Sequence, residues 1–279
     1  MQGRDPKSAL LRAAVYTFLF WMAAALLGWT LTNLAGYFFG ATASTLAAAW
    51  FANFLALRIW EPRPFLDLGL RWSTRSATNL ALGMAGGIGT ALLVLAVPLV
   101  VRVARLESSP SVSFGTVLWV VSLLLVGSAG EELLFRGFGF QVLLRTFGNY
   151  TIILPVAVLF AVLHGANPNS TALGLANTAG FGVLFGYAFL RSRDLWLPIG
   201  LHFGWNLALT LFGVNVSGFT IKLTGYTLAW SAGPLWSGGD YGPEGSILTS
   251  AALVALFLFL WRAPVRAQSA PMLDAEEDG

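Results

Sequence analysis

Two adjacent carboxylates and an arginine share the segment "EELLFR", residues 131–136, inside one of the long apolar runs of the chain. Glu132 and Arg136 are four residues apart, so on a helix their side chains meet on one face as an ion pair. Glu131 then points about 100° away from Glu132, because a helix has 3.6 residues per turn. The spacing predicts that Arg136 neutralises Glu132 and that Glu131 stays free to face a cavity.

Both histidines of the chain lie in other apolar runs, His164 in "FAVLH" and His202 in "HFGWN". Helical spacing places Phe160 on the face of His164 and Asn206 on the face of His202. A carboxylate and two imidazoles around one water form a general-base site. Ionisable residues inside a membrane are functional candidates by default. The alternatives are a structural ion-pair network and ordinary hydrogen bonds between helices.

The elements that carry these residues are strongly apolar. Of 279 residues, 56% are hydrophobic and 10% are charged, and the mean hydropathy is +0.71. Lipid offers the backbone no hydrogen-bond partners, so long apolar runs must be helices. The sequence predicts an all-α, polytopic transmembrane bundle of about eight spans. The runs are 11–36, 41–58, 79–101, 115–136, 151–166, 171–190, 195–213 and 246–261.

The distribution of positive charge predicts the orientation of the chain. With the N-terminus in the cytoplasm, twelve Lys and Arg residues fall in cytoplasmic segments, and only Arg102, Arg105 and Lys222 fall on the other side. This asymmetry predicts an N-in, C-in topology. The net charge of +3 is then a matter of topology and indicates no nucleic-acid partner. The chain has no cysteine, which excludes disulfides, thiolate metal sites and a cysteine nucleophile.

The depth of the residues limits how the fourth run can be built. If the helix of that run ended at Arg136, Glu131 would lie about 8 Å from the cytoplasmic edge and His164 about 20 Å deep, at about 1.5 Å per residue. If the helix continues to Arg145, Glu131 lies about 21 Å deep and the two residues can meet. We therefore expect a long or tilted fourth span with Arg136 inside the membrane.

At these residues the sequence resembles the CPBP family of intramembrane proteases, which includes CAAX prenyl endopeptidases and bacterial bacteriocin-processing or Abi-type self-immunity proteins. "EELLFR" matches the family's EExxxR, "FAVLH" matches FxxxH and "HFGWN" matches HxxxN. The three motifs occur in the family's order, and the resemblance covers residues 115–210. It implies an eight-helix bundle that encloses a water-filled cavity and cuts peptide bonds at the membrane.

The resemblance also implies roles for the individual residues. Glu131 would activate the attacking water with His164 beside it. His202 and Asn206 would support the oxyanion and the scissile carbonyl. Glu132 and Arg136 would hold the geometry, with Phe160 as a further supporting residue.

The cofactor is left open by the sequence. Zinc would accept Glu131, His164 and His202 as ligands, with a fourth position for water. Neither histidine belongs to an HExxH motif, in which one helix supplies two ligands and a general base. A metal-free route would use Glu131 as the base and Asn206 as an oxyanion donor. No metal is assigned, and Zn²⁺ is kept as the alternative.

The domain organisation follows from these predictions. We expect a cytoplasmic N-terminal segment (1–10), a transmembrane protease domain (11–262) and a disordered cytoplasmic tail (263–279). Arginine exceeds lysine by 14 to 2, which indicates a bacterial cytoplasmic membrane. Bacteria are not expected to prenylate proteins, so we expect the substrate to be a membrane-associated peptide or protein. The alternatives are a proton-coupled membrane transporter and a non-catalytic membrane scaffold that retains the site.

Overall fold

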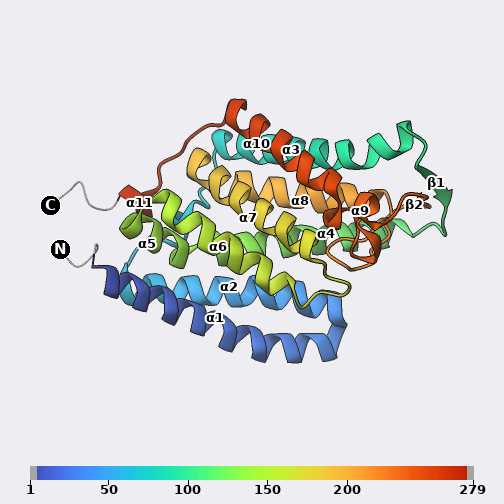
Figure 1. The fold of residues 1–279 in the computed structure, drawn as a ribbon. Helices are drawn as coiled ribbons and strands as arrows, with labels where there is room; N and C mark the ends of the chain where they lie inside the picture. Colours follow the sequence, from blue (N-terminus) through green and yellow to red (C-terminus); the bar gives the residue numbers. More distant parts are fainter. Residues whose placement is uncertain (1–4, 275–279) are drawn as a thin grey trace.

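The computed structural model describes residues 5–274 as a bundle of helices that run back and forth along one direction (Figure 1). Both ends of the described chain lie at one end of the bundle, and a short antiparallel strand pair lies at the other (Figure 1). The predicted all-α class is confirmed. The main helices are α1 (Pro6–Ala35), α2 (Tyr37–Trp60), α3 (Thr74–Val100), α4 (Phe114–Arg136), α5 (Phe138–Phe147), α6 (Asn149–His164), α7 (Ala172–Ser192), α8 (Trp196–Leu211) and α10 (Ile247–Arg262).

Shorter elements complete the chain at the two ends of the bundle. Strands β1 (Ala104–Ser108) and β2 (Tyr226–Trp230) pair in the register Ala104↔Trp230 to Ser108↔Tyr226. The remaining elements are η2 (Phe65–Leu68), α9 (Pro234–Ser237), η3 (Gly239–Tyr241), η4 (Pro243–Gly245) and α11 (Pro271–Asp274).

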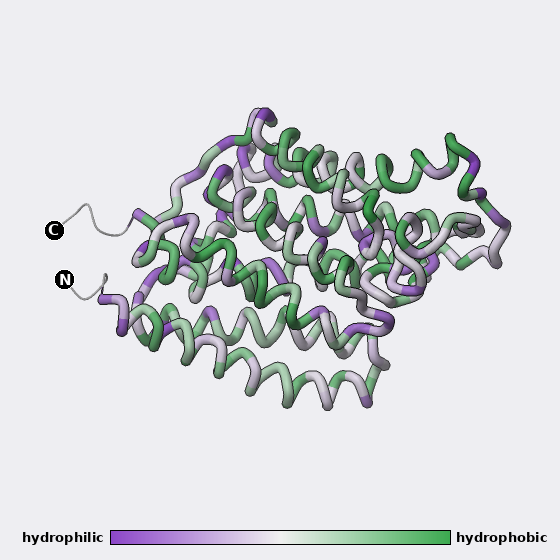
Figure 2. Tube along the Cα trace, in the orientation of Figure 1, coloured by the Kyte–Doolittle hydropathy of each residue, from purple (hydrophilic) through white to green (hydrophobic). Residues whose placement is uncertain are grey.

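Each of the eight predicted apolar runs contains a helix, and the helices are mainly hydrophobic between polar bundle ends (Figure 2). Within residues 5–274, five helical stretches are long and apolar enough to cross a membrane. These stretches are α1, α2, α3, α7 and the joined α4–α5 segment of 34 residues. Helices α6, α8 and α10 have 16 residues each. The count of eight spans and the N-in, C-in topology stay predictions.

Helix α8 is largely buried and packs closely against α3. Glycines make this contact possible, since a Cβ on Gly87 would lie 2.2 Å from the carbonyl oxygen of Leu201. A Cβ on Gly83 would likewise lie 2.4 Å from the carbonyl oxygen of Leu197. In lipid, where packing replaces hydrophobic drive, small residues let helix backbones touch in this way. The α3 glycines therefore fix the position of α8, which carries His202.

The fourth span is long, as predicted, with a joined α4–α5 stretch of 34 residues, but it is not one continuous helix, because Gly137 separates α4 from α5. At Gly137 the backbone leaves the helical region, with a ψ of −147°. The amide of Phe138 donates instead to the Asn53 side chain, 2.7 Å away. Tyr16 and Asn53 donate in turn to carbonyls of the last turn of α4. Side chains of α1 and α2 thus stabilise the interruption.

Residues 263–274, which belong to the segment predicted to be a disordered tail (263–279), follow a defined path in the structure. This segment returns across the end of the bundle, where Asn79 of α3 both accepts from the Arg266 amide and donates to its carbonyl. Met272 is fully buried. Apolar burial and backbone hydrogen bonds hold this stretch in place, and the residues after 274 lie outside the described part of the chain. At the other terminus α1 begins at Pro6, inside the segment predicted to precede the first span.

Candidate active site

Glu132 and Arg136 form a fully buried ion pair on α4, and both side chains have no exposed surface. The Arg136 Nη1 atom lies 3.2 Å from Glu132, and Nη2 donates to the carbonyl of Gly182 on α7 at 2.9 Å. The guanidinium also lies over three aromatic rings, an arrangement that stabilises a desolvated cation. These rings belong to Phe135, Phe160 and Phe185, at 5.7, 5.5 and 5.4 Å from the guanidinium carbon.

Besides its ion pair with Arg136, Glu132 accepts a hydrogen bond from His202. The His202 Nδ1 atom lies 3.1 Å from the Glu132 Oε1 atom, between α8 and α4. An ionised carboxylate only accepts hydrogen bonds, so Nδ1 carries the proton and donates it. The Nε2 atom of the same ring is then directed away from Glu132 toward the cavity.

His164, at the last position of α6, is oriented in the same way. Its Nδ1 atom lies 2.8 Å from the carbonyl oxygen of Phe160, one turn earlier. A carbonyl only accepts, so Nδ1 again carries the proton and Nε2 is left with a free lone pair. The Phe160 ring lies 4.4 Å from the His164 ring and 6.2 Å from the His202 ring, between centroids. Phe160 therefore packs against both histidines and against Arg136.

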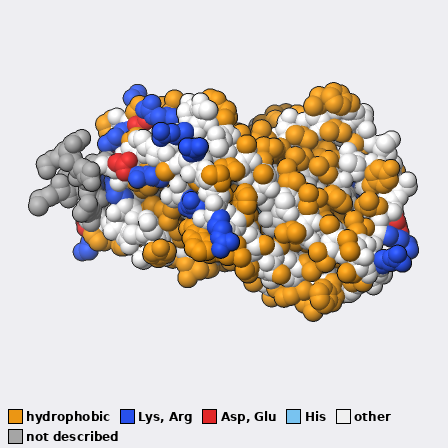
Figure 3. All heavy atoms as spheres, turned by 90° about the horizontal axis from the view of Figure 1, so that it is seen from above, with side chains coloured by type: hydrophobic (Ala, Val, Ile, Leu, Met, Phe, Trp, Pro, Cys, Tyr) orange, Lys and Arg blue, Asp and Glu red, His pale blue; other side chains and the backbone are white. Residues whose placement is uncertain are grey.

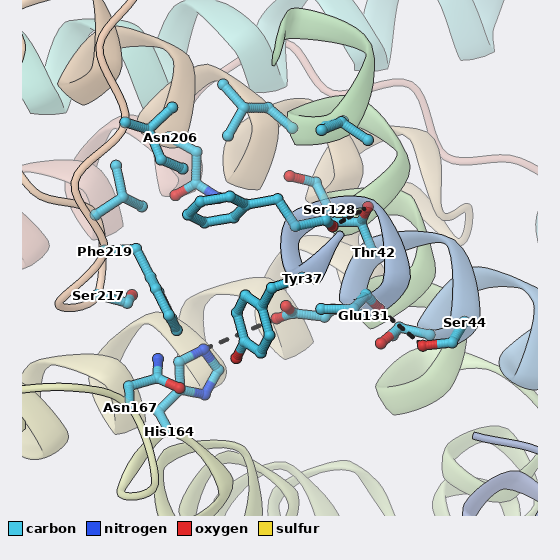
Figure 4. A pocket seen from close by; sticks show the side chains of 18 of the residues that line it. Tyr37, Thr42, Ser44, Ser128, Glu131, His164, Asn167, Asn206, Ser217 and Phe219 are labelled. Carbon is cyan, nitrogen blue, oxygen red and sulfur yellow. Dashed lines mark hydrogen bonds and ion pairs between the residues drawn. The ribbon is translucent and has the colours of Figure 1, made fainter. Parts of the chain in front are cut away.

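Glu131 lies close to the free Nε2 atoms of both histidines. Its Oε2 atom is 3.9 Å from Nε2 of His164 and 3.9 Å from Nε2 of His202. Within the described residues this buried oxygen has no hydrogen-bond partner, although 31% of the side chain is exposed to the cavity. Figure 4 shows Glu131 reaching from α4 toward His164. Three lone pairs directed at one region can hold and deprotonate a water molecule.

A cavity of about 790 Å³ adjoins these groups and gives them access to a ligand. Glu131, His164, His202 and Asn206 all line it. Asn206 lies one turn after His202 on α8, and its side chain points into the site from another side than Glu131 (Figure 4). The structure therefore brings together all four residues that the sequence singled out as catalytic candidates, together with Glu132, Arg136 and Phe160 around them.

Glu244 is a carboxylate of this region that sequence reasoning missed. It accepts from the Trp205 indole at 3.1 Å and from the Ser217 hydroxyl at 2.9 Å, and the Ser217 amide also donates to it. Glu244, His164 and His202 line a second cavity of about 20 Å³, roughly the space of one water molecule. Burial raises the pKa of the Glu244 carboxyl, against the opposing effect of the Ser217 and Trp205 donors.

Glu131, His164 and His202 have the donor types of a zinc site but not its spacing. Neutral imidazoles and a carboxylate are suitable donors, but ligands of tetrahedral zinc lie about 3.3–3.6 Å apart, since each bond is about 2.0–2.2 Å. The Nε2–Oε2 separations here are both 3.9 Å. Within residues 5–274, no group of three or more His, Cys, Asp or Glu side chains is arranged to hold a metal ion. As placed, these side chains are too far apart for tetrahedral zinc.

The fold and this site define an integral membrane protein in which a Glu/His/His/Asn constellation lines a cavity inside a helical bundle. The family model described as Type II CAAX prenyl endopeptidase Rce1-like matches residues 113–208. This segment contains every residue of the three motifs, and the match confirms the resemblance to the intramembrane proteases of the CPBP family. No curated protein matches the chain. The family indicates a protease that acts in a membrane environment.

Proposed function

We propose that the chain is an intramembrane endopeptidase that hydrolyses peptide bonds of membrane-associated proteins or peptides with a water activated by Glu131. One observation carries this proposal. The Glu131 Oε2 atom lies 3.9 Å from the free nitrogen of each histidine, and all three residues line a cavity of about 790 Å³. A hydrolase needs this combination of a base, a neighbouring proton carrier and room for a substrate.

In the proposed reaction Glu131 removes a proton from water as the water oxygen attacks the scissile carbonyl. The new C–O bond converts the carbonyl into a tetrahedral oxyanion. The proton passes from Glu131 to the departing nitrogen, directly or by way of the His164 Nε2 atom, as the C–N bond breaks. The products are a carboxyl terminus and an amino terminus, so atoms and protons balance.

Asn206 and His202 support the oxyanion in this scheme. The Asn206 amide is a neutral donor that needs no change of protonation. His202 donates from Nε2 in its imidazolium form, which takes its extra proton from solvent before the attack and keeps it through the reaction, and the Glu132 carboxylate at its Nδ1 atom stabilises that form. Arg136 balances the charge of Glu132 and fixes its position.

The experiment that tests the proposal compares newly formed peptide termini in membranes that contain the wild-type chain or Glu131→Gln. Termini found only with the wild type are expected, and they identify the substrate. A matched control is Glu107→Gln, which changes a partly exposed carboxylate on β1 that does not line the cavity and should give the wild-type pattern. Identical termini with all three proteins, each present and folded, would contradict proteolysis by this site.

A further inference from the structure

The catalytic cavity extends toward one end of the bundle. From Glu131, near the middle of the α4–α5 stretch, its lining runs back along α4 to Trp119 in the second turn. It also includes Tyr37 at the start of α2, Asn167 just after α6 and Lys222 in the loop before β2. Apart from Glu131, these positions lie toward the end that carries β1 and β2, opposite the chain termini (Figure 1).

The two ends of the bundle differ sharply in positive charge. Within residues 5–274, the end next to the termini carries eleven Lys and Arg side chains and the other end carries three. Figure 3 shows Lys and Arg side chains gathered at the end beside the grey termini. The eleven are Lys7, Arg12, Arg58, Arg63, Arg71, Arg75, Arg145, Arg191, Arg193, Arg262 and Arg266. Cytoplasmic segments next to membrane spans hold an excess of Lys and Arg. The cation-rich end is therefore the cytoplasmic end.

Taken together, the lining and the charges point to the side from which a substrate enters. We infer that the catalytic cavity opens toward the extracytoplasmic face of the membrane and takes peptides or membrane-protein segments presented from that face. The inference rests on the proposed function for the identity of the substrate as a peptide. The side of the opening depends only on the geometry and the charge distribution.

The chemistry of the cavity mouth, which we define as Tyr37, Trp119, Phe219 and Lys222, suits such a substrate. Tyr37 and Trp119 are 57% and 51% exposed, and aromatic rings with a polar edge favour the membrane interface. The Tyr37 and Phe219 rings lie 5.8 Å apart and form an apolar rim. Lys222 is the single Lys or Arg side chain that lines the cavity within the described residues. The mouth therefore suits a largely apolar segment that enters from the interface.

This orientation has a consequence for substrate class. A prenylated carboxyl terminus made in the cytoplasm would meet the cation-rich end of the bundle, whereas the cavity mouth lies at the opposite end. Extracytoplasmic segments of membrane proteins and exported peptides reach the mouth directly. The predicted substrates are therefore extracytoplasmic segments of membrane proteins and exported peptides.

The chain is its own cysteine-free background for a test, because its sequence contains no cysteine. Three exposed positions serve as reporters: Lys222→Cys at the mouth, Ser111→Cys at the same end outside the cavity, and Thr74→Cys at the cation-rich end. Intact bacterial cells that express each full-length variant are treated with a membrane-impermeant maleimide. A second sample of each is treated after permeabilisation.

We expect Lys222→Cys and Ser111→Cys to be labelled in intact cells and Thr74→Cys to be labelled only after permeabilisation. The reverse pattern, or labelling of both Ser111→Cys and Thr74→Cys in intact cells, would overturn the inference. Protection of Lys222→Cys in intact cells while Ser111→Cys is labelled would also overturn it, because the mouth would then be closed to that face. Labelling needs no turnover, so a failure of the proposed proteolysis leaves this result unchanged.

Discussion

Removal of the Glu132 charge tests the buried ion pair that holds His202. In Glu132→Gln the side chain keeps its size and one acceptor oxygen, but Arg136 loses its counter-ion while it remains fully buried. Breaking a buried pair from one side costs about 3–5 kcal/mol. The Gly182 carbonyl and the three aromatic rings remain as partners of the guanidinium, so we expect the low end, about 3 kcal/mol. That cost corresponds to a folding equilibrium constant lowered by about 100-fold.

The measurement is reversible unfolding of the purified protein in mixed detergent micelles, with the midpoint and slope recorded for each variant. The matched control is Glu132→Gln combined with Arg136→Met, which removes both charges and keeps an apolar side chain among the rings. Replacing a whole buried pair with apolar groups is often neutral in stability. The reasoning would be refuted if Glu132→Gln were as stable as the wild type, or if the double variant were no more stable than the single one.

Three further outcomes follow from the structure. Gly87→Ala places a Cβ 2.2 Å from the Leu201 carbonyl oxygen and should strongly lower the yield of folded protein. In the control Gly89→Ala the new Cβ meets nothing within 4 Å, so this variant should fold normally. Equal yields of the two variants would contradict the α3–α8 contact. Because burial raises the pKa of Glu244, the protonated carboxyl stabilises the fold below a pH of about 4.5, and this stabilisation is lost as the pH rises through the folded-state pKa. The melting temperature of Glu244→Gln, measured relative to that of the wild type, should therefore rise with pH. A difference that stays constant with pH would contradict burial as the cause. Proteolysis should survive dialysis against a metal chelator, because Glu131 acts on water without a metal in our scheme; loss of activity that zinc restores would contradict it.

Local spacing made part of the site predictable. The Glu132–Arg136 pair follows from a separation of four residues on one helix, and the different direction of Glu131 follows from adjacency. The meeting of Glu131 with His164 could be anticipated from depth, because a longer α4–α5 stretch brings both to a similar level. These features depend on the geometry of single helices, which follows from residues close together in the sequence.

Other features depend on contacts between distant parts of the chain. The interruption at Gly137 needs Asn53 and Tyr16, which lie on α2 and α1. Glu244 lies in a polar loop that looks like a simple connection, and only the fold brings it to Trp205 and the histidines. The order of residues 263–274 depends on Asn79, far earlier in the sequence. No local pattern in the sequence predicts these contacts.

The central claim, that Glu131 activates water for peptide-bond hydrolysis, is tested most directly with purified protein in liposomes. The rate of cleavage of a peptide identified from the membrane termini would be measured for the wild type and for Glu131→Gln, with folding checked by circular dichroism. Loss of a general base costs about 10²–10⁴ in rate. We predict a loss in that range with binding of the peptide retained. Cleavage by folded Glu131→Gln at the wild-type rate would contradict the account.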